Sequence, residues 1–345
     1  MTVLRVSVFS LSILLVGSVN AARLAEAQEV SGPYTGKNVT MTISYGPGGG
    51  YDIYGRLVAR YLGGHLPGGP NVVVKNMAAA GGVVGANYLY NVAQRDGTEI
   101  GMINQNAALG QVIGTAGVKY DAREFTWVGR ITSGIETFYA WHTSLVKTIA
   151  QAKTYQIVAG GTGPTSSSEI MPRVMNELIG TKFKTVSGYP DGESVALALQ
   201  RGEVDAYVTV WSVAKARNAD WLRDKKISVL VQFGLERHAD LTDVPTLLEL
   251  ATNDEDRHVI ALFGSGDTVG RAIVAPPLLP ADRATILRTG FEATMKDLKL
   301  IDEANKAGID LDFMSGEKLQ EAIASAFDVS PAVVAKAAAL NTPRK

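Results

Sequence analysis

One glycine-rich stretch decides the fold: Ser44-Tyr45-Gly46-Pro47-Gly48-Gly49-Gly50-Tyr51-Asp52. It follows the alternating strand pattern of residues 39–43 and runs into a helical pattern of apolar residues over 54–62. The first amides of a helix have no partners inside the helix, and the helix dipole gives them a positive potential. Because glycine has no Cβ, a ligand can approach such a loop closely. The stretch therefore predicts a site for a small anion, although a turn that serves only strand–helix packing would have the same composition.

The loop fits neither of the common nucleotide-binding motifs. A Walker loop ends in Gly-Lys-Ser/Thr, whereas Gly50 is followed by Tyr51 and Asp52. A dinucleotide fingerprint requires a third glycine where this chain has Tyr51. The loop also contains no Lys or Arg that could pair with a phosphate. We therefore expect a carboxylate rather than a phosphate at this site.

The N-terminal residues 1–27 have the pattern of a secretory signal peptide. Arg5 is followed by the apolar run Val6–Val16, and small residues offer cleavage sites at Ala21 and Ala27. The apolar run is too short to span a membrane, which takes about 20 residues. The chain has no Cys, which excludes disulfides and thiolate metal sites. These features predict an exported protein of the bacterial periplasm.

Composition excludes several classes of partner. The 33 basic residues nearly balance the 34 acidic ones, so we expect no nucleic-acid or anionic-membrane binding. After removal of the signal peptide roughly 320 residues remain, which is enough for two domains of ordinary size. Hydrophobic residues make up 46% of the chain, which predicts a well-filled core.

Short apolar strands alternate with longer amphipathic segments along the mature chain, which predicts an α/β fold with parallel sheets and helices on both faces. Ligands of such sheets bind at the carboxyl ends of the strands. Three more strand ends carry suitable loops. A glycine loop at 76–82 follows one strand, Asn104 and Gln105 end another, and a loop rich in Gly, Ser and Thr at 160–168 follows a third. Two lobes that each present helix N-termini would clamp a small anion between them.

The chain resembles the extracytoplasmic solute receptors of tripartite tricarboxylate transporters, the Bordetella-uptake-gene (Bug) type of periplasmic binding protein. The resemblance covers nearly all of the mature chain. The blocks that carry it are 46–52 with Arg56, 72–76 running into 80–82, 96–98, 188–192, 202–205, 244–246, and 275–277 with Pro280.

This resemblance implies a type II periplasmic-binding-protein fold, a Venus flytrap of two α/β lobes joined by two crossing strands. We expect the first lobe to hold residues 37–138 and 270–345 and the second lobe to hold 139–269. The resemblance also implies a monomeric receptor that delivers a small carboxylate to a membrane permease of one large and one small subunit. Carried over residue by residue, it gives as ligand contacts Tyr45, Gly46, Gly48, Gly49, Tyr51, Asp52, Ala80, Gly81, Gly82, Thr162, Thr165, Ser166, Ser167, Tyr189 and Asp205.

The chain departs from the family's pattern at three positions. It has Ser44 in place of Pro, Tyr51 in place of a small Ser or Thr, and Ala79 in place of Gly. Tyr51 would place a ring at the mouth of the carboxylate site, where it could narrow the pocket or stack on a flat ligand. The ligands of relatives are therefore no guide to the ligand of this chain.

Three of the candidate positions have a second interpretation. Asp52 can be the N-cap of the following helix rather than a ligand contact. The hydroxyls of 166–168 can start a helix, and Asp205 can cap a strand.

Two other functional classes remain. A hydrolase or transferase would need a nucleophile with a base, and the sequence has no Gly-x-Ser-x-Gly elbow, no Cys and no His-Glu-x-x-His motif. The four histidines are scattered. We therefore expect no catalysis, no metal and no cofactor. A ligand-sensing receptor for a signalling partner would share the fold and is not separable by sequence.

Overall fold

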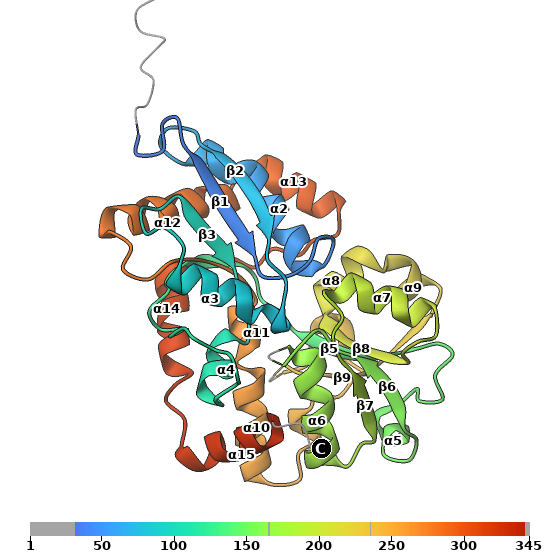
Figure 1. The fold of residues 1–345 in the computed structure, drawn as a ribbon. Helices are drawn as coiled ribbons and strands as arrows, with labels where there is room; N and C mark the ends of the chain where they lie inside the picture. Colours follow the sequence, from blue (N-terminus) through green and yellow to red (C-terminus); the bar gives the residue numbers. More distant parts are fainter. Residues whose placement is uncertain (1–31, 165, 235, 342–345) are drawn as a thin grey trace, which may run out of the picture.

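The computed structural model describes residues 32–164, 166–234 and 236–341. The expected signal peptide and Thr165 lie outside the described residues. Two α/β lobes lie side by side, each built on its own sheet (Figure 1). Within the described residues no helix has both the length and the apolar character needed to cross a membrane.

The first lobe contains a six-stranded sheet in the order β11-β4-β10-β3-β1-β2. Its strands are β1 (Asn38–Ile43), β2 (Asn71–Asn76), β3 (Glu99–Met102), β4 (Thr126–Thr132), β10 (Arg271–Ala275) and β11 (Met314–Ser315). Its helices are α2 (Gly50–Leu62), η1 (Gly63–His65), η2 (Ala80–Gly82), α3 (Val83–Asn91), α4 (Ala107–Val112), α12 (Ala281–Met295), α13 (Leu298–Lys306) and α14 (Gly316–Ser325). β1, β2 and β3 are parallel, as predicted, whereas β10 runs antiparallel to both of its neighbours.

The second lobe contains a five-stranded sheet in the order β7-β6-β8-β5-β9. Its strands are β5 (Glu136–Trp141), β6 (Ile157–Gly160), β7 (Phe183–Val186), β8 (Ala206–Val210) and β9 (Ile227–Gln232). Its helical segments are α5 (Ile149–Ala152), α6 (Ser167–Ile179), α7 (Gly192–Gln200), α8 (Trp211–Arg217), α9 (Ala219–Arg223), η3 (Ala239–Leu241), η4 (Leu248–Leu250) and α10 (Asp254–Gly264). The short helix α11 (Gly266–Val269), which precedes β10, packs on α4 and α14 of the first lobe. β5 runs antiparallel to both β8 and β9.

Both sheets are therefore mixed, which corrects the expectation of parallel sheets. The antiparallel strands β5 and β10 are the first strands that the chain forms after each passage between the lobes. Their reversed direction matters for function. It places their first residues, Glu136 and Arg271, at the sheet edges where the parallel strands end, opposite Val210 of β8 and beyond Met102 of β3.

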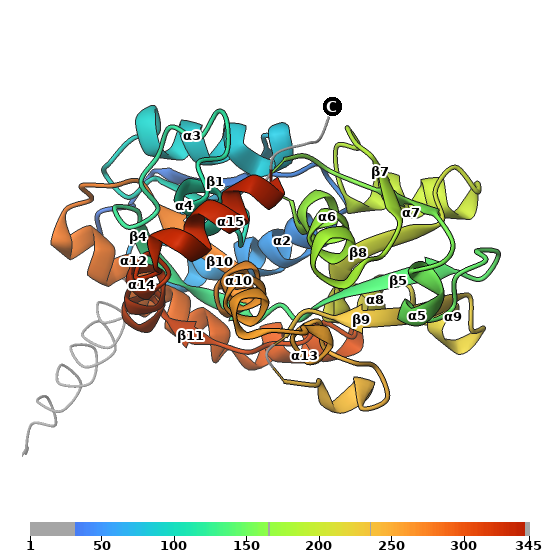
Figure 2. The same ribbon diagram turned by 90° about the horizontal axis from the view of Figure 1, so that it is seen from below.

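The expected lobe boundaries need two corrections. The outbound passage is the segment 133–135 between β4 and β5, because residues 136–141 pair only within the second sheet. The C-terminal helix α15 (Pro331–Asn341) packs on α6 and α10 of the second lobe (Figure 2). Val333 and Ala337 are buried in that lobe's core, and Arg173 donates to Asn341 at 2.9 Å. The chain thus crosses between the lobes a third time.

The strand that precedes the glycine-rich stretch is anchored by alternating burial. Val39, Met41 and Ile43 of β1 are completely buried against α2. Gly55 of α2 allows the helix to lie close to the sheet, because a Cβ at this position would lie 2.6 Å from Cδ1 of Ile43. This packing fixes where the N-terminus of α2 points.

Candidate functional site

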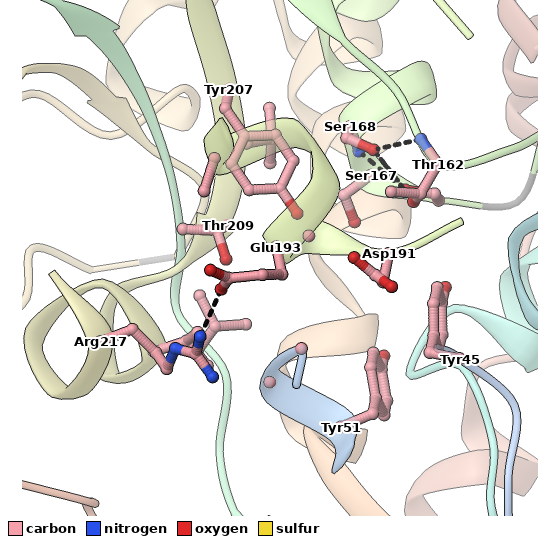
Figure 3. Close-up of a pocket in the computed structure, with 18 of the residues that line it drawn as sticks. Tyr45, Tyr51, Thr162, Ser167, Ser168, Asp191, Glu193, Tyr207, Thr209 and Arg217 are labelled. Carbon is pink, nitrogen blue, oxygen red and sulfur yellow. Dashed lines mark hydrogen bonds and ion pairs between the residues drawn. The ribbon is translucent and has the colours of Figure 1, made fainter. Parts of the chain in front are cut away.

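A pocket of about 80 Å³ lies between the lobes (Figure 3). The N-termini of three helices line it: α2 from the first lobe, and α6 and α7 from the second. Each N-terminus brings amides that have no partners inside the helix, and a positive potential, to the same space. The polar, aromatic and glycine residues that line the pocket include Tyr45, Gly48, Gly49, Tyr51, Asn104, Glu136, Tyr139, Thr162, Ser166, Ser167, Asp191, Glu193, Tyr207, Arg217 and Arg271.

Asp52 holds the glycine-rich stretch in shape rather than facing the pocket. Its carboxylate is 4% exposed and accepts from the Gly48 amide at 2.9 Å, from Nε of Arg56 at 2.8 Å and from Nδ2 of Asn76 at 2.8 Å. Burial alone would raise the pKa of Asp52, but these hydrogen bonds lower it overall. The N-cap of α2 is Gly49, so Asp52 lies in the first turn. Neither interpretation of Asp52 from the sequence describes this role.

Tyr51 lies between an aromatic ring and a guanidinium. The Tyr45 and Tyr51 rings are stacked, with centroids 4.4 Å apart and planes inclined by 10°. Cζ of Arg271 lies 4.0 Å from the centroid of the Tyr51 ring, and the Gln105 amide donates to the Tyr51 hydroxyl at 2.9 Å. A ring covered in this way has no free face for a flat ligand. Stacking on a flat ligand, one of the two roles considered for Tyr51, is therefore not possible in this conformation, and the ring supports Arg271 instead.

The second predicted loop lies apart from this pocket. The Tyr45 hydroxyl donates to the Gly81 carbonyl at 2.8 Å. Gly163 of the second lobe lies against the loop so closely that a Cβ there would be 2.3 Å from the Gly81 amide nitrogen. Ala80, Gly81 and Gly82 instead line a separate hollow, together with Tyr189. The structure thus divides the predicted contacts into two groups.

Of the two roles considered for the hydroxyls at the start of α6, the structure shows the helix-starting one at Ser166. Ser166 is the N-cap, and its hydroxyl accepts from the Ser168 amide at 3.2 Å and from the Thr162 hydroxyl at 2.7 Å. Ser167 instead reaches the first lobe, where Nδ2 of Asn106 donates to its hydroxyl at 2.7 Å. Asn104 lines the pocket, whereas the buried Gln105 does not line it and instead accepts from Arg271.

Asp205 and Gly46 have structural roles. The Asp205 carboxylate accepts from the Val158 amide at 2.9 Å, at the start of β8 and so at the sheet edge opposite the pocket. The strand-capping interpretation describes it. A Cβ at Gly46 would lie 2.3 Å from Oδ2 of Asp191, so Gly46 allows the second lobe to approach the first.

Five charged residues of the pocket were not predicted. Arg217 forms an ion pair with Glu193 and also donates to the Gly48 carbonyl of the other lobe (Figure 3). Asp191 is the N-cap of α7 and accepts from the Ser194 amide at 2.8 Å. Glu136 and Arg271 begin the two antiparallel strands. A search of strand carboxyl ends misses such residues. The sequence signal that could have identified Glu136 and Arg271 is a charged residue at the first position of an otherwise apolar strand.

Burial raises the pKa of Glu136 from 4.5 to about 7, against the lowering effects of the Ser167 hydroxyl and the Arg271 charge. A carboxyl whose pKa is higher in the folded protein stabilises the fold fully below its ordinary pKa. We therefore expect the free energy of unfolding to fall between pH 4.5 and about 7, by up to about 3 kcal/mol at about 1.4 kcal/mol per pKa unit.

Urea titrations from pH 4.5 to 8 of the wild type and Glu136→Gln check this expectation. The variant should show a weaker dependence on pH. Some dependence should remain, because burial, the main cause of the raised pKa of Asp267, is still present in the variant, which removes only the contribution of the Glu136 charge. An identical slope in both proteins would contradict it.

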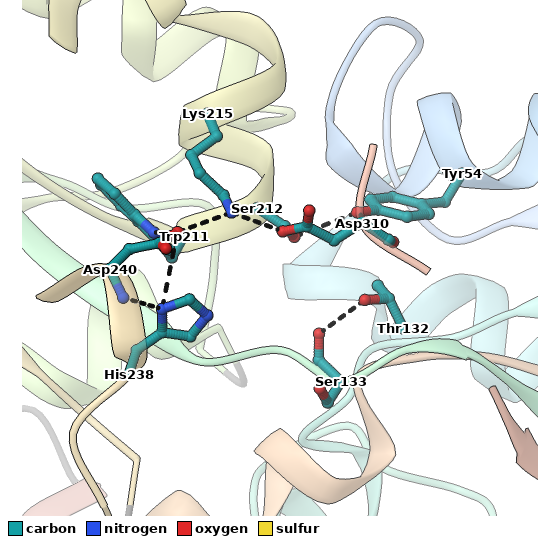
Figure 4. A network of polar contacts seen from close by, with 9 residues as sticks. All are labelled: Tyr54, Thr132, Ser133, Trp211, Ser212, Lys215, His238, Asp240 and Asp310. Atoms are coloured by element: carbon teal, nitrogen blue, oxygen red, sulfur yellow. Dashed lines mark hydrogen bonds and ion pairs between the residues drawn. The ribbon is translucent and has the colours of Figure 1, made fainter. Parts of the chain in front are cut away.

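A second set of contacts joins the lobes on another side of the passage between them (Figure 4). Nζ of Lys215 in α8 lies 2.8 Å from the Asp240 carboxylate of its own lobe and 3.0 Å from the Asp310 carboxylate of the first lobe. The Tyr54 hydroxyl of α2 donates to Ser212 in α8 at 3.1 Å. These contacts can form only while the lobes are together.

Comparisons with known proteins agree with this architecture. The sequence matches the family described as "Tripartite tricarboxylate transporter family receptor" over residues 56–338. A search of curated protein sequences returned no significant match.

Three solved structures are similar in fold. The periplasmic binding protein BugD aligns with a TM-score of 0.68 and 19% identity, over 84% of this chain and 94% of its own. An R. palustris protein with bound adipate aligns with a TM-score of 0.68 and 19% identity, over 88% of this chain and 97% of its own. MatC from Rhodopseudomonas palustris with bound malate aligns with a TM-score of 0.65 and 19% identity, over 86% of this chain and 98% of its own. The type II periplasmic-binding-protein fold expected from the sequence is thereby confirmed.

Proposed function

The chain belongs to the tripartite tricarboxylate transporter family of receptors, and on that premise we propose that it captures a small organic carboxylate between its two lobes. Members of this family are solute receptors rather than enzymes, and they act outside the cytoplasm. The neighbours in fold with bound adipate and bound malate support a carboxylate as the ligand.

The observation that carries this proposal is the convergence of three helix N-termini on one pocket that contains two arginines. Amides at a helix N-terminus and guanidinium groups both favour a bound anion. The ligand contacts that we propose from the first lobe are the amides of Gly49 and Tyr51 and the side chain of Arg271. From the second lobe we propose the hydroxyls of Ser167 and Tyr207.

We further propose that the closed, loaded protein docks on a two-subunit permease and releases the carboxylate to it. Family membership supports this step. Contacts such as those of Arg217 with Gly48 and of Lys215 with Asp310 stabilise the closed form, which a permease must distinguish from the open form. We propose a periplasmic location and export by the N-terminal signal peptide.

A thermal-shift screen of the mature protein tests the carboxylate. Mono-, di- and tricarboxylates, their amides, sugars and metal cations are compared. A ligand at 100 times its dissociation constant adds about 2.7 kcal/mol to stability, which is a readily measured rise in melting temperature. We expect at least one carboxylate, and none of the amides, to raise it. A response to sugars or cations alone would contradict the proposal.

The ion pair between Lys215 and Asp310 should favour closure. Lys215→Met keeps the apolar stem and removes the charge, so we expect the affinity for a bound carboxylate to fall about threefold, as for a partly exposed pair. Lys306→Met is the matched control, because Lys306 pairs with Asp302 within one exposed helix. Calorimetric titration should show no change for the control. Equal affinities of Lys215→Met and wild type would exclude this role.

A further inference from the structure

Arg271 is a buried cation to which the described part of the chain supplies no ion-pair partner. It is 5% exposed, and it lines the pocket between the lobes. Its Nη1 donates to Oε1 of Gln105 at 2.5 Å, and its guanidinium lies against the Tyr51 ring. Among the residues that the structure describes, no carboxylate forms an ion pair with Arg271, and its buried Nε has no hydrogen-bond partner.

An unpaired buried charge lowers the stability of the folded protein, so a purely structural role does not explain it. A buried charge is normally paired, because transfer of an ion from water to a protein interior costs several kcal/mol. Arg130 shows the usual solution in this chain. It is equally buried but donates to the Asp312 carboxylate at 2.8 Å and to the Thr268 carbonyl at 2.7 Å.

The surroundings of Arg271 hold it in place without neutralising it. The Tyr51 ring, which is itself stacked on Tyr45, fixes the guanidinium plane, and Gln105 fixes one edge. Glu136 and Asp267 interact electrostatically with the guanidinium, but burial raises the pKa of both carboxyl groups. The guanidinium therefore keeps donors for an incoming carboxylate.

We propose that Arg271 is the charged anchor of the ligand and pairs directly with its carboxylate. This inference rests on the proposed function. Two acids that line the same pocket define the rest of the ligand. Glu136 and Asp191 line it without an ion-pair partner among the described residues, whereas Glu193 is paired with Arg217. A second carboxylate would face these acids, whereas a hydroxyl or amino group would donate to them.

The ligand class that follows is a small acid with one carboxylate and a neighbouring hydroxyl or amino group. The pocket volume of about 80 Å³ also favours a small ligand. The Tyr139 hydroxyl adds a further contact, because it is buried in the pocket wall and none of the described residues forms a hydrogen bond with it. This class differs from the dicarboxylates adipate and malate that are bound in the neighbours in fold.

Calorimetric titration with lactate, alanine, lactamide and succinate tests the inference on the wild type, Arg271→Met and Arg271→Lys. We expect the wild type to bind lactate or alanine more tightly than succinate and to reject lactamide. Arg271→Met should lose at least about 30-fold in affinity for the bound acid. Arg271→Lys should lose less, because it keeps the charge but not the planar fork.

The melting temperature of the ligand-free protein separates a ligand-binding role from a structural one. In Arg271→Met an apolar side chain replaces an unpaired buried charge, so the melting temperature should stay unchanged or rise. Arg130→Met, which removes a paired arginine, should lower it without changing the preference for the acid over its amide.

Two results would overturn the anchor role of Arg271, a third would overturn the ligand class, and a fourth would overturn the proposed function. Binding of the acid to Arg271→Met within threefold of wild type would exclude an anchor. A fall in the melting temperature of both Arg271 variants like that of Arg130→Met would assign a structural role. A wild type that prefers succinate would refute the ligand class alone. A wild type that binds no carboxylate in the wider screen would refute the proposed function.

Discussion

Gly163→Ala is expected to lower the affinity for every ligand by about 100-fold, because it prevents the lobes from closing. Gly163 has φ +136°, and a Cβ there would lie 2.3 Å from the amide nitrogen of Gly81 in the other lobe. The clash is with backbone, which cannot rotate away as a side chain can. A factor of 100 corresponds to about 2.8 kcal/mol of lost closure energy. Calorimetric titration with the ligand found in the screen measures it.

The matched control is Gly188→Ala. Gly188 also has a positive φ, of +102°, but a Cβ at this position meets nothing within 4 Å. The control therefore carries the backbone strain without the contact between lobes, and its affinity should stay within about threefold of wild type. Equal losses in both variants would mean that local strain, rather than closure, controls binding.

Asp52→Ala is expected to lower both stability and affinity. The substitution leaves the Gly48 amide, Arg56 and Asn76 without the carboxylate that they share. Hydrogen bonds to a charged group are worth about 1.5–3 kcal/mol each, so we expect a loss of roughly 3 kcal/mol in the free energy of unfolding. The affinity should fall about tenfold, because the first loop loses the geometry that aims its amides.

Asp96→Ala controls for the loss of stability. The Asp96 carboxylate accepts from the amide of Thr98 at 2.9 Å and from its hydroxyl, in a loop that does not line the pocket. This variant should lose stability and keep its affinity, as judged by urea unfolding and calorimetry. If Asp52→Ala loses affinity while its stability stays at the wild-type value, Asp52 contacts the ligand directly, and the scaffold role is wrong.

Local patterns predicted much of the fold. The alternation in β1, the glycine-rich stretch and the apolar face of α2 are each contained in a few consecutive residues, and each was found where expected. The same holds for the loop that leads into α6 and for the amides at the end of β3. Strand direction is different, because the periodicity of a strand is the same whichever way it runs. Glu136 and Arg271 were missed for this reason.

Other features depend on contacts between distant segments. The Tyr51 ring at the pocket mouth was expected from the sequence, but its partner Arg271 is 220 positions away along the chain. Helix α15 is rich in alanine, so its pattern does not indicate which lobe it covers. Asp52 lies where N-caps are common, and only the fold shows that Asn76 and Gly48 share its carboxylate.

The central claim, that a carboxylate closes the two lobes on itself, is tested most directly by a distance measurement across the cleft. The chain contains no native Cys, so spin labels can be placed on cysteines at exposed Lys299 of the first lobe and exposed Lys153 of the second. Pulsed electron paramagnetic resonance then reports the distance between the lobes. With the bound carboxylate, the account predicts one narrow distribution at the distance of the closed structure, and with its amide, the broader distribution of the free protein. A carboxylate that binds without changing the distribution would contradict the account.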